Sequence, residues 1–273
     1  MSQLVDDATS RASMSPAASA AAIAAELSHC VNARITAAEI TGEATKGLRL
    51  LGRGVPQIMR AFTRLEPLAQ RSVWGMQPTM RFDPDDPSYE LDERSARRGL
   101  DLHQLISAHA LTVNPLLPSL NPDVRVAPVA IGCILVDEVA AVLPGPFDPQ
   151  GRPTAWLVTD PAIVDLARSA WRVTWSASTP VGDDRPPALS RRQVEVAKGL
   201  IRGVKDATLA RQLNVSPRTV VADMSHLLEH LGARSRAEAV FILGGGAALK
   251  RTRDRVAVPD CSDEMGPRAR GGR

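Results

Sequence analysis

Lys205 and Arg218 each lie beside the predicted start of a helix, where a cationic side chain could bind an anion. Ser216 suits an N-cap and Pro217 the first position of a helix, so Arg218 falls in the first turn. Lys205 precedes the helix before it. Ammonium and guanidinium groups at such positions donate to phosphate oxygens. If the helix that begins at Ser216 lies against nucleic acid, we expect phosphate contacts from these residues.

Other chemistry finds little support in the residue pattern. The three cysteines are too few and too scattered for a disulfide framework or a zinc cluster, and they suit a reducing cytoplasm. The acidic stretch 81–93 lacks the central Gly of a calcium loop, and Pro87 occupies a ligand position. No apolar run reaches the roughly 18 residues of a membrane span. We therefore expect no metal, no cofactor and no membrane partner.

Four helices are predicted around the phosphate-binding residues. Ser190 and Gln193 can form a capping box for the first, the second runs from about Asp206 to Leu213, and Asn214 suits a left-handed turn. The third begins at Ser216, and a fourth follows a second predicted capping box. At 100° per residue the third helix has an apolar face of Val220, Met224, Leu227, Leu228 and Leu231. Its other face projects, as in the recognition helix of a helix-turn-helix unit.

The same stretch resembles a known family. The runs LSRRQVEVAKGLIRG, TLARQLNVSPRTV and HLGARSRAEAV are similar to the LuxR/GerE-type helix-turn-helix domain of bacterial transcription factors. The resemblance covers about 58 residues without a gap. It implies Thr219 on a phosphate and positions 221, 222 and 225 near base edges. The residues expected to contact DNA are Lys205, Arg211, Ser216, Arg218, Thr219, Val221, Ala222 and Ser225.

Four positions depart from the family pattern. Gln193 and Thr208 replace usual acids, Asp223 replaces a usual His, and His230 replaces a usual Lys. The residues nearest the bases, moreover, are short or apolar rather than basic. These changes leave less direct hydrogen-bond readout, and they put strong DNA affinity more in question than the fold.

The charge of the chain is divided unevenly. Residues 1–187 hold 17 Lys and Arg against 21 Asp and Glu, whereas residues 188–273 hold 16 against 9. A net charge of −4 therefore precedes a net charge of +7. This asymmetry suits a C-terminal unit that meets phosphate and an N-terminal body that does not.

The preceding residues predict an α/β body. A β-branched stretch within 124–143, interrupted by Asp137 and Glu138, indicates a buried hairpin, and 154–159 indicates another strand. Asp160 can cap a helix that begins with Pro161. Strands interleaved with helices give the α/β class, followed by an all-α, four-helix unit.

A looser resemblance covers about 110 residues of this body. The pattern RRGLDL, then VDEVAAVLPG, then WRVTW resembles the phospholipase D-like effector domain of TrmB-type and related actinobacterial regulators. A catalytic member would need His-x-Lys pairs to attack and release a phosphoryl group. No histidine of this chain is followed two residues on by Lys. We therefore expect no catalytic residue and no enzyme activity.

The N-terminal helix left two alternatives open. Ile23, Leu27, Val31 and Ile35 recur at a spacing of four, which fits either an amphipathic helix on its own domain or a dimerising helix. The predicted organisation is 1–16 disordered, 17–62 helical and a candidate for dimerisation, 63–177 α/β effector-like, 178–188 linker, 189–246 helix-turn-helix and 247–273 disordered basic tail.

The functional prediction is a sequence-specific transcriptional regulator that binds a promoter operator in double-stranded DNA. We expect a cytoplasmic homodimer, with RNA polymerase as a further candidate partner. Abundant Ala and rare Lys beside Arg suggest an actinobacterial regulator of specialised metabolism. The alternative is a regulator that has kept the helix-turn-helix for protein interaction, with weak or no direct DNA binding.

Overall fold

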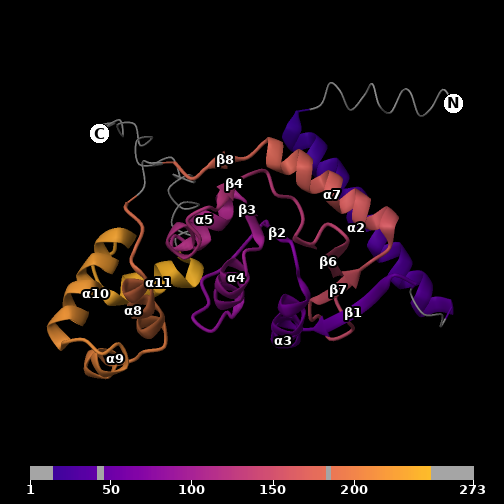
Figure 1. Ribbon diagram of the computed structural model, residues 1–273. Coiled ribbons are helices and arrows are strands. Elements are labelled where there is room, and N and C mark those ends of the chain that lie inside the picture. The colour runs from indigo at the N-terminus through magenta and orange to yellow at the C-terminus, as the bar shows by residue number, and fades with distance from the viewer. Residues whose placement is uncertain (1–14, 42–45, 183–185, 247–273) are drawn as a thin grey trace, which may run out of the picture.

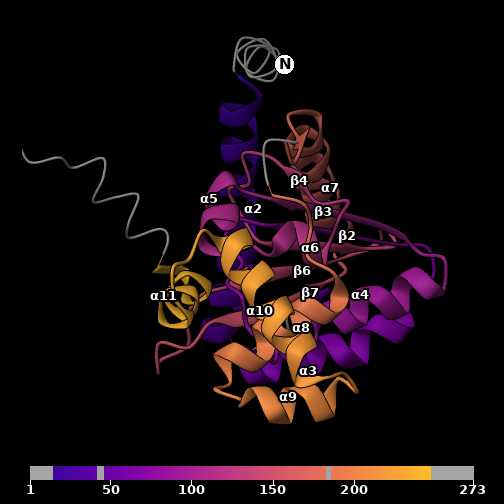
Figure 2. The same ribbon diagram turned by 90° about the vertical axis from the view of Figure 1, so that its left-hand side faces the viewer.

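The computed structural model describes residues 15–41, 46–182 and 186–246. Figure 1 shows a body built on a β-sheet and, to one side of it, a helical head that ends the described chain. In Figure 2 the head faces the viewer, in front of the sheet. The α/β class with a C-terminal helical domain is therefore confirmed. None of the helices in these ranges has the length and apolar character to cross a lipid bilayer.

The body contains a sheet of eight strands in the order β1-β7-β6-β5-β2-β3-β4-β8 within the described residues. Strands β2, β3 and β4 are parallel, and every other neighbouring pair is antiparallel. The strands are β1 Leu48–Arg53, β2 Ser72–Gln77, β3 Asp101–Ile106, β4 Arg125–Val126, β5 Cys133–Val136, β6 Ala140–Gly145, β7 Thr154–Val158 and β8 Thr179–Pro180. Helices supply the crossovers between the parallel strands, as parallel pairing requires.

The predicted hairpin is the β5–β6 pair. Asp137 and Glu138 adopt positive φ angles of 52° and 58° in its turn. The Asp137 carboxylate accepts hydrogen bonds from the backbone N–H groups of Gln70, Arg71 and Ser72. Burial raises the pKa of this carboxyl, but these hydrogen bonds outweigh burial, and the pKa lies below its usual range. The turn is thus fixed by a residue that also holds the start of β2.

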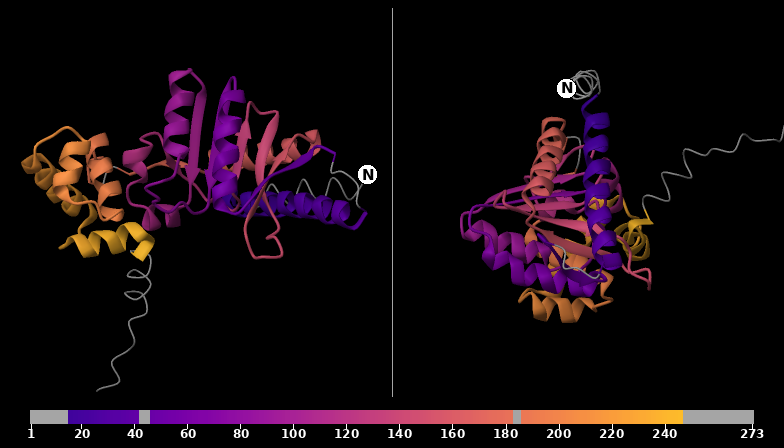
Figure 3. Two further views of the ribbon diagram at one scale, coloured as in Figure 1. Left: turned by 90° about the horizontal axis from the view of Figure 1, so that it is seen from below. Right: turned by 90° about the vertical axis from the view of Figure 1, so that its right-hand side faces the viewer.

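Two long helices cover one face of the sheet. α2 (Pro16–Thr41) and α7 (Pro161–Ser176) run side by side in Figures 1 and 3. The Asp160 side chain caps α7 by accepting from the N–H groups of Ala162 and Ile163, as predicted. Arg34 of α2 donates to the same carboxylate at 2.6 Å. One N-cap residue therefore also ties the two helices together.

The apolar stripe of α2 is buried inside its own chain. Leu27, Val31 and Ile35 belong to one core cluster with Trp171 of α7 and Leu135 of β5. The dimerising alternative for this stripe is therefore wrong, because α7 and the sheet already cover it. The stripe thus packs against residues that follow it by a hundred or more positions in the chain.

α3 (Val55–Leu65) covers the opposite face. Its Ile58 clusters with Val142 and Ala155, whereas Ala141 and Leu143 belong to the core under α2 and α7. Successive residues of a strand point to opposite faces, so the body has three layers. The remaining body helices are η1 Glu66–Leu68, α4 Ser88–Arg97, α5 Ala108–Val113 and α6 Leu117–Leu120.

Two predicted segment boundaries need correction. Segment 17–62 is not wholly helical, since it contains β1, which pairs with β7 and makes this segment part of the body. The predicted linker 178–188 begins with β8, which pairs with β4 at the sheet edge. The predicted disordered ends, 1–16 and 247–273, lie almost wholly outside the described residues, except that α2 already begins at Pro16.

The head contains the four predicted helices and one further turn. They are α8 Arg191–Ile201, α9 Asp206–Gln212, α10 Pro217–Leu231, α11 Arg236–Phe241 and the π-helical turn η2 Ile242–Gly246. α8 and α9 approach closely at Gly199, where an added Cβ would overlap a methyl carbon of Leu209. Val196, Ala197 and Leu227 are completely buried between the head helices.

Candidate nucleic-acid interface

α10 begins and ends at residues whose local conformation fixes its position. The Ser216 hydroxyl accepts from the Thr219 N–H at 3.1 Å, and Pro217 follows at the first helical position. Asn214 has a φ of 53° in the turn before it, and Gly232 closes the helix with a φ of 60°. The predicted cap and left-handed turn are both confirmed. The N-terminal half of α10 is therefore held by contacts within a few residues of sequence.

α10 presents two different faces. Val220, Met224 and Leu227 are buried, as the helical periodicity predicts. Val221 is 52% exposed, and Ala222 and Ser225 are exposed beside it. We call Val221, Ala222 and Ser225 the outer strip. The Ser225 hydroxyl donates to the Val221 carbonyl at 3.1 Å, so the strip offers the solvent mainly carbon atoms.

The other predicted contact residues lie on α9 and at the start of α10. Lys205 precedes α9, Arg211 lies in the last turn of α9, and Arg218 lies in the first turn of α10. All three are exposed, and among the described residues no ion pair neutralises them. Thr219 is half-buried, with its hydroxyl 2.8 Å from that of Ser216. The head thus carries cations available to a polyanion.

An ion pair that sequence reasoning missed connects α8 to α10, and only its carboxylate is buried. Arg192 donates to both carboxylate oxygens of Asp223, at 2.6 and 3.1 Å. The Asp223 side chain is only 4% exposed, whereas that of Arg192 is 48% exposed. Hydrogen bonding to this carboxylate raises the pKa of Arg192. The signal available in the sequence was the acid at 223, which departs from the family's usual His.

A second ion pair connects α9 to α11. Arg236 donates to the two carboxylate oxygens of Asp206 at 2.7 and 2.6 Å. The hydrogen bond from Arg236 lowers the pKa of the Asp206 carboxyl. The Arg192–Asp223 pair joins α8 to α10, and this second pair joins α9 to α11. Each helix of the head is therefore tied to one other helix by a two-pronged ion pair.

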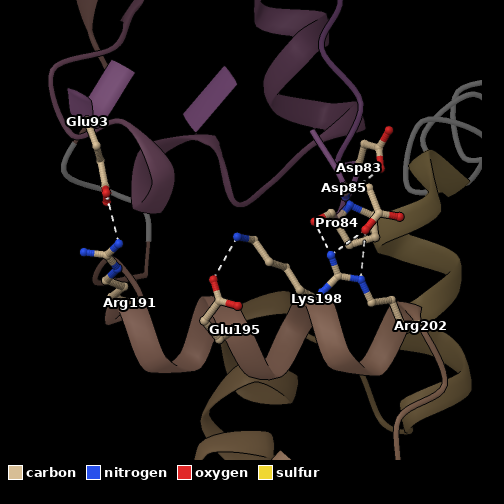
Figure 4. A network of polar contacts seen from close by, with 8 residues as sticks. All are labelled: Asp83, Pro84, Asp85, Glu93, Arg191, Glu195, Lys198 and Arg202. Atoms are coloured by element: carbon tan, nitrogen blue, oxygen red, sulfur yellow. Dashed lines mark hydrogen bonds and ion pairs between the residues drawn. The ribbon is translucent and has the colours of Figure 1, made fainter. Parts of the chain in front are cut away.

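α8 also joins the head to the body, as Figure 4 shows. Arg191 donates to Glu93 of α4 at 3.0 Å, and Arg202 donates to the Asp85 carboxylate and the Pro84 carbonyl at 3.1 and 2.8 Å. Asp85 and Glu93, in the acidic stretch that does not fit a calcium loop, thus form ion pairs with arginines of the head. Within the described residues, no group of three or more metal-ligating side chains is found.

Apolar contacts reinforce the same junction. Phe82 and Leu116 of the body belong to one buried cluster with Leu189, Val194 and Leu243 of the head. The Leu189 N–H donates to the Ser119 hydroxyl of α6 at 2.9 Å. The body therefore completes the core of the head. In Figure 1 the body contacts the head from the side of α8 and α11, whereas α10 lies at the outer edge.

Comparison with known proteins agrees with this arrangement for the head. The model of the bacterial regulatory proteins of the luxR family matches residues 187–243. This range agrees with the predicted helix-turn-helix segment, which begins two residues later and ends three residues later. Among curated proteins, no sequence relative matches this chain.

Solved structures provide more distant matches. Nuc, a phospholipase D family member from Salmonella typhimurium, has a TM-score of 0.40 and 14% identity, covering 49% of this chain and 97% of Nuc. The archaeal chromatin protein TrmBL2 has a TM-score of 0.38 and 13% identity, covering 57% of this chain and 65% of that chain.

A third match is VqmA from Vibrio cholerae, solved with ligand and DNA. Its TM-score is 0.22 with 22% identity, and the match covers 43% of this chain and 50% of VqmA. The capped α10, its projecting outer strip and the family match over 187–243 concern the same residues. Residues 187–243 accordingly match the helix-turn-helix domain of the luxR family of bacterial regulatory proteins, which supports a DNA-binding role for the head.

Proposed function

We propose that this protein is a sequence-specific transcriptional regulator that binds promoter DNA as a homodimer, with α10 in the major groove. The observation that carries the proposal is the exposed outer strip on a helix whose N-terminus is capped and whose buried face is fixed. Helix-turn-helix proteins place the N-terminal half of this helix against base edges. Lys205, Arg211 and Arg218 supply phosphate contacts from around the strip.

The homodimer is part of the proposal because one recognition helix reads only one half-site. The stripe of α2 no longer qualifies as its interface, since it is buried within the body. We base dimerisation on the apolar residues Val240, Phe241 and Ile242 of the head. Val240 and Phe241 are 39% and 45% exposed, whereas Ile242 is buried and does not qualify as an interface residue. Sedimentation of the full chain at tens of micromolar tests this part, and a monomer would contradict it.

The body has a regulatory rather than a catalytic role in this proposal. The sequence contains no His-x-Lys pair. His103 contacts Asp101 at 3.2 Å and packs against Trp175, with ring centroids 4.6 Å apart, but no Lys stands two positions after it. Purified protein should not hydrolyse phosphodiesters above background, and a turnover lost on His103→Ala or His109→Ala would contradict this assignment.

The cellular setting belongs to the same proposal. We place the regulator in the bacterial cytoplasm, with RNA polymerase as a further partner and a specialised-metabolite pathway as its target. Support for the target comes from composition alone, since Ala is abundant and Lys is rare beside Arg. Transcript profiling of a deletion strain tests it, and unchanged expression of every such pathway would contradict it.

A second candidate function follows from the apolar character of the outer strip. Val221 and Ala222 stand where a basic residue would give direct base contacts, so the same surface suits a partner protein. This alternative predicts a folded head without selective DNA binding. The two functions are separated by one variant of the outer strip.

The test is binding of Ala222→Glu to a footprinted promoter fragment at two salt concentrations. The added carboxylate faces the groove without touching the buried face of α10, so affinity should fall by at least tenfold through repulsion from phosphates. Ala162→Glu adds the same charge on α7 and is the matched control, expected to bind like the parent. Circular dichroism checks that both variants are folded. Equal binding by folded Ala222→Glu would favour the partner-protein alternative.

A further inference from the structure

The outer strip has a chemistry that few base edges match. Val221 and Ala222 expose only methyl groups, and Ser225 gives its hydroxyl hydrogen to the Val221 carbonyl. None of these three side chains can donate the paired hydrogen bonds by which Arg or Lys reads guanine, or offer the amide by which Asn or Gln reads adenine. A helix with this strip in the major groove therefore depends on shape and apolar contact.

One group in the major groove is apolar. Thymine carries a C5-methyl that projects into the groove, and small apolar side chains contact it. The cations on the head favour a polyanion as the occupant of the strip, because Lys205, Arg211 and Arg218 are exposed and lack ion pairs within the described chain. Charge complementarity and apolar contact are satisfied together by duplex DNA with thymines facing the strip.

Ser225 adds a second requirement. With its hydrogen donated to the backbone, its oxygen can only accept. The base groups that donate in the major groove are the amino groups of adenine N6 and cytosine N4. The hydroxyls of Ser216 and Thr219 are paired with each other at 2.8 Å, so they do not change the apolar character of the strip.

We infer that α10 recognises its operator by packing Val221 and Ala222 against thymine methyl groups, next to an adenine or cytosine amino group that donates to Ser225. This inference rests on the proposed function, since it places α10 in the major groove. It assigns the specificity to carbon contacts rather than to charged side chains. Phosphate contacts from the surrounding cations supply most of the affinity and none of this discrimination.

The experiment begins with selection of duplexes from a random pool by the full-length protein. The preferred duplex is then synthesised with uracil in place of each thymine in turn, which removes one methyl group and keeps the base pair. Each methyl buried against the strip should contribute about fourfold in affinity, from about 0.8 kcal/mol per buried carbon group. Replacements outside the read positions should change nothing.

Val221→Ala tests whether the contribution of a thymine methyl group to affinity depends on Val221. Since Val221 is 52% exposed, the substitution removes no core packing. It should weaken binding to the thymine duplex about fourfold and leave binding to the matching uracil duplex nearly unchanged, so the two changes are not additive. Arg218→Ala is the control, because loss of a phosphate contact should weaken both duplexes equally.

The outcomes separate this inference from the proposed function. Selection without any enriched duplex, from protein shown to be folded, would overturn both. Selective binding in which no uracil replacement matters, or in which Val221→Ala weakens thymine and uracil duplexes alike, would overturn the methyl contact and leave DNA recognition by the head intact.

Discussion

Replacing Leu116 with Ala should uncouple the head from the body. Leu116 belongs to the body by sequence, but it is completely buried in the cluster that contains Leu189, Val194 and Leu243 of the head. Shortening a fully buried Leu to Ala costs about 3–5 kcal/mol through lost transfer free energy and the remaining cavity. This loss falls on the junction rather than on the sheet.

The ion pairs at the same junction should contribute much less to its stability than Leu116 does. The side chains of Arg191 and Arg202 are 79% and 43% exposed, and exposed pairs contribute about 0–1 kcal/mol each. We therefore expect the double variant Arg191→Ala with Arg202→Ala to keep the head attached. Comparison of this variant with Leu116→Ala shows whether carbon contacts or charges hold the junction.

Urea unfolding followed by two signals makes this measurable. All four tryptophans, at positions 74, 156, 171 and 175, lie in the body, so their fluorescence reports the body alone. Circular dichroism reports the helices of both units. In the parent the two curves should coincide, whereas in Leu116→Ala part of the dichroism should be lost at lower urea, before the fluorescence changes.

Leu105→Ala is the matched control, because Leu105 is equally buried but belongs to the core of the sheet. It should shift the fluorescence transition itself. Coincident signals in Leu116→Ala, with a midpoint equal to that of the parent, would contradict this prediction. Such a result would mean that the head retains its core without the body.

Two further predictions concern stability. Burial, with a contribution from Asp86, raises the pKa of Asp92 to about 6, so ionisation destabilises the fold as pH rises from about 4 through 6. Asp92→Asn should match the parent near pH 4 and be more stable by about 1–2 kcal/mol at pH 7.5 in urea unfolding; equal stability at both pH values would contradict this. Ser216→Ala loses the cap on the Thr219 N–H and should lower the free energy of unfolding of the head by about 1 kcal/mol, seen as an earlier thermal transition. Ser225→Ala, exposed in the middle of the same helix, is its control, and an equal shift in both variants would count against the cap.

Features whose causes are local could be predicted from the sequence. The caps at Ser190, Ser216 and Asp160 and the left-handed Asn214 all depend on residues within three positions. The buried face of α10 follows from helical periodicity in the same way. These signals, with the family resemblance, were sufficient to locate the head and its outer strip.

For the stripe of α2, the local sequence could not predict which surface covers it. Its spacing predicts burial, yet the spacing is the same whether the covering surface belongs to a second copy or to the same chain. Only the tertiary structure places α7 and the sheet against Leu27, Val31 and Ile35. β1 was missed for a related reason, since its register with β7 joins residues more than a hundred positions apart.

Periodicity and capping residues were enough to predict which helix of the head projects and which of its residues face outward. What holds that helix in place can be seen only in the folded chain. The Arg192–Asp223 pair spans 31 positions, and Leu116 enters the core of the head from an even more distant segment. Such contacts form when folding brings remote side chains together in a space that excludes water, where apolar packing is favourable and an unpaired charge is costly. Neither condition is encoded in the spacing of neighbouring residues.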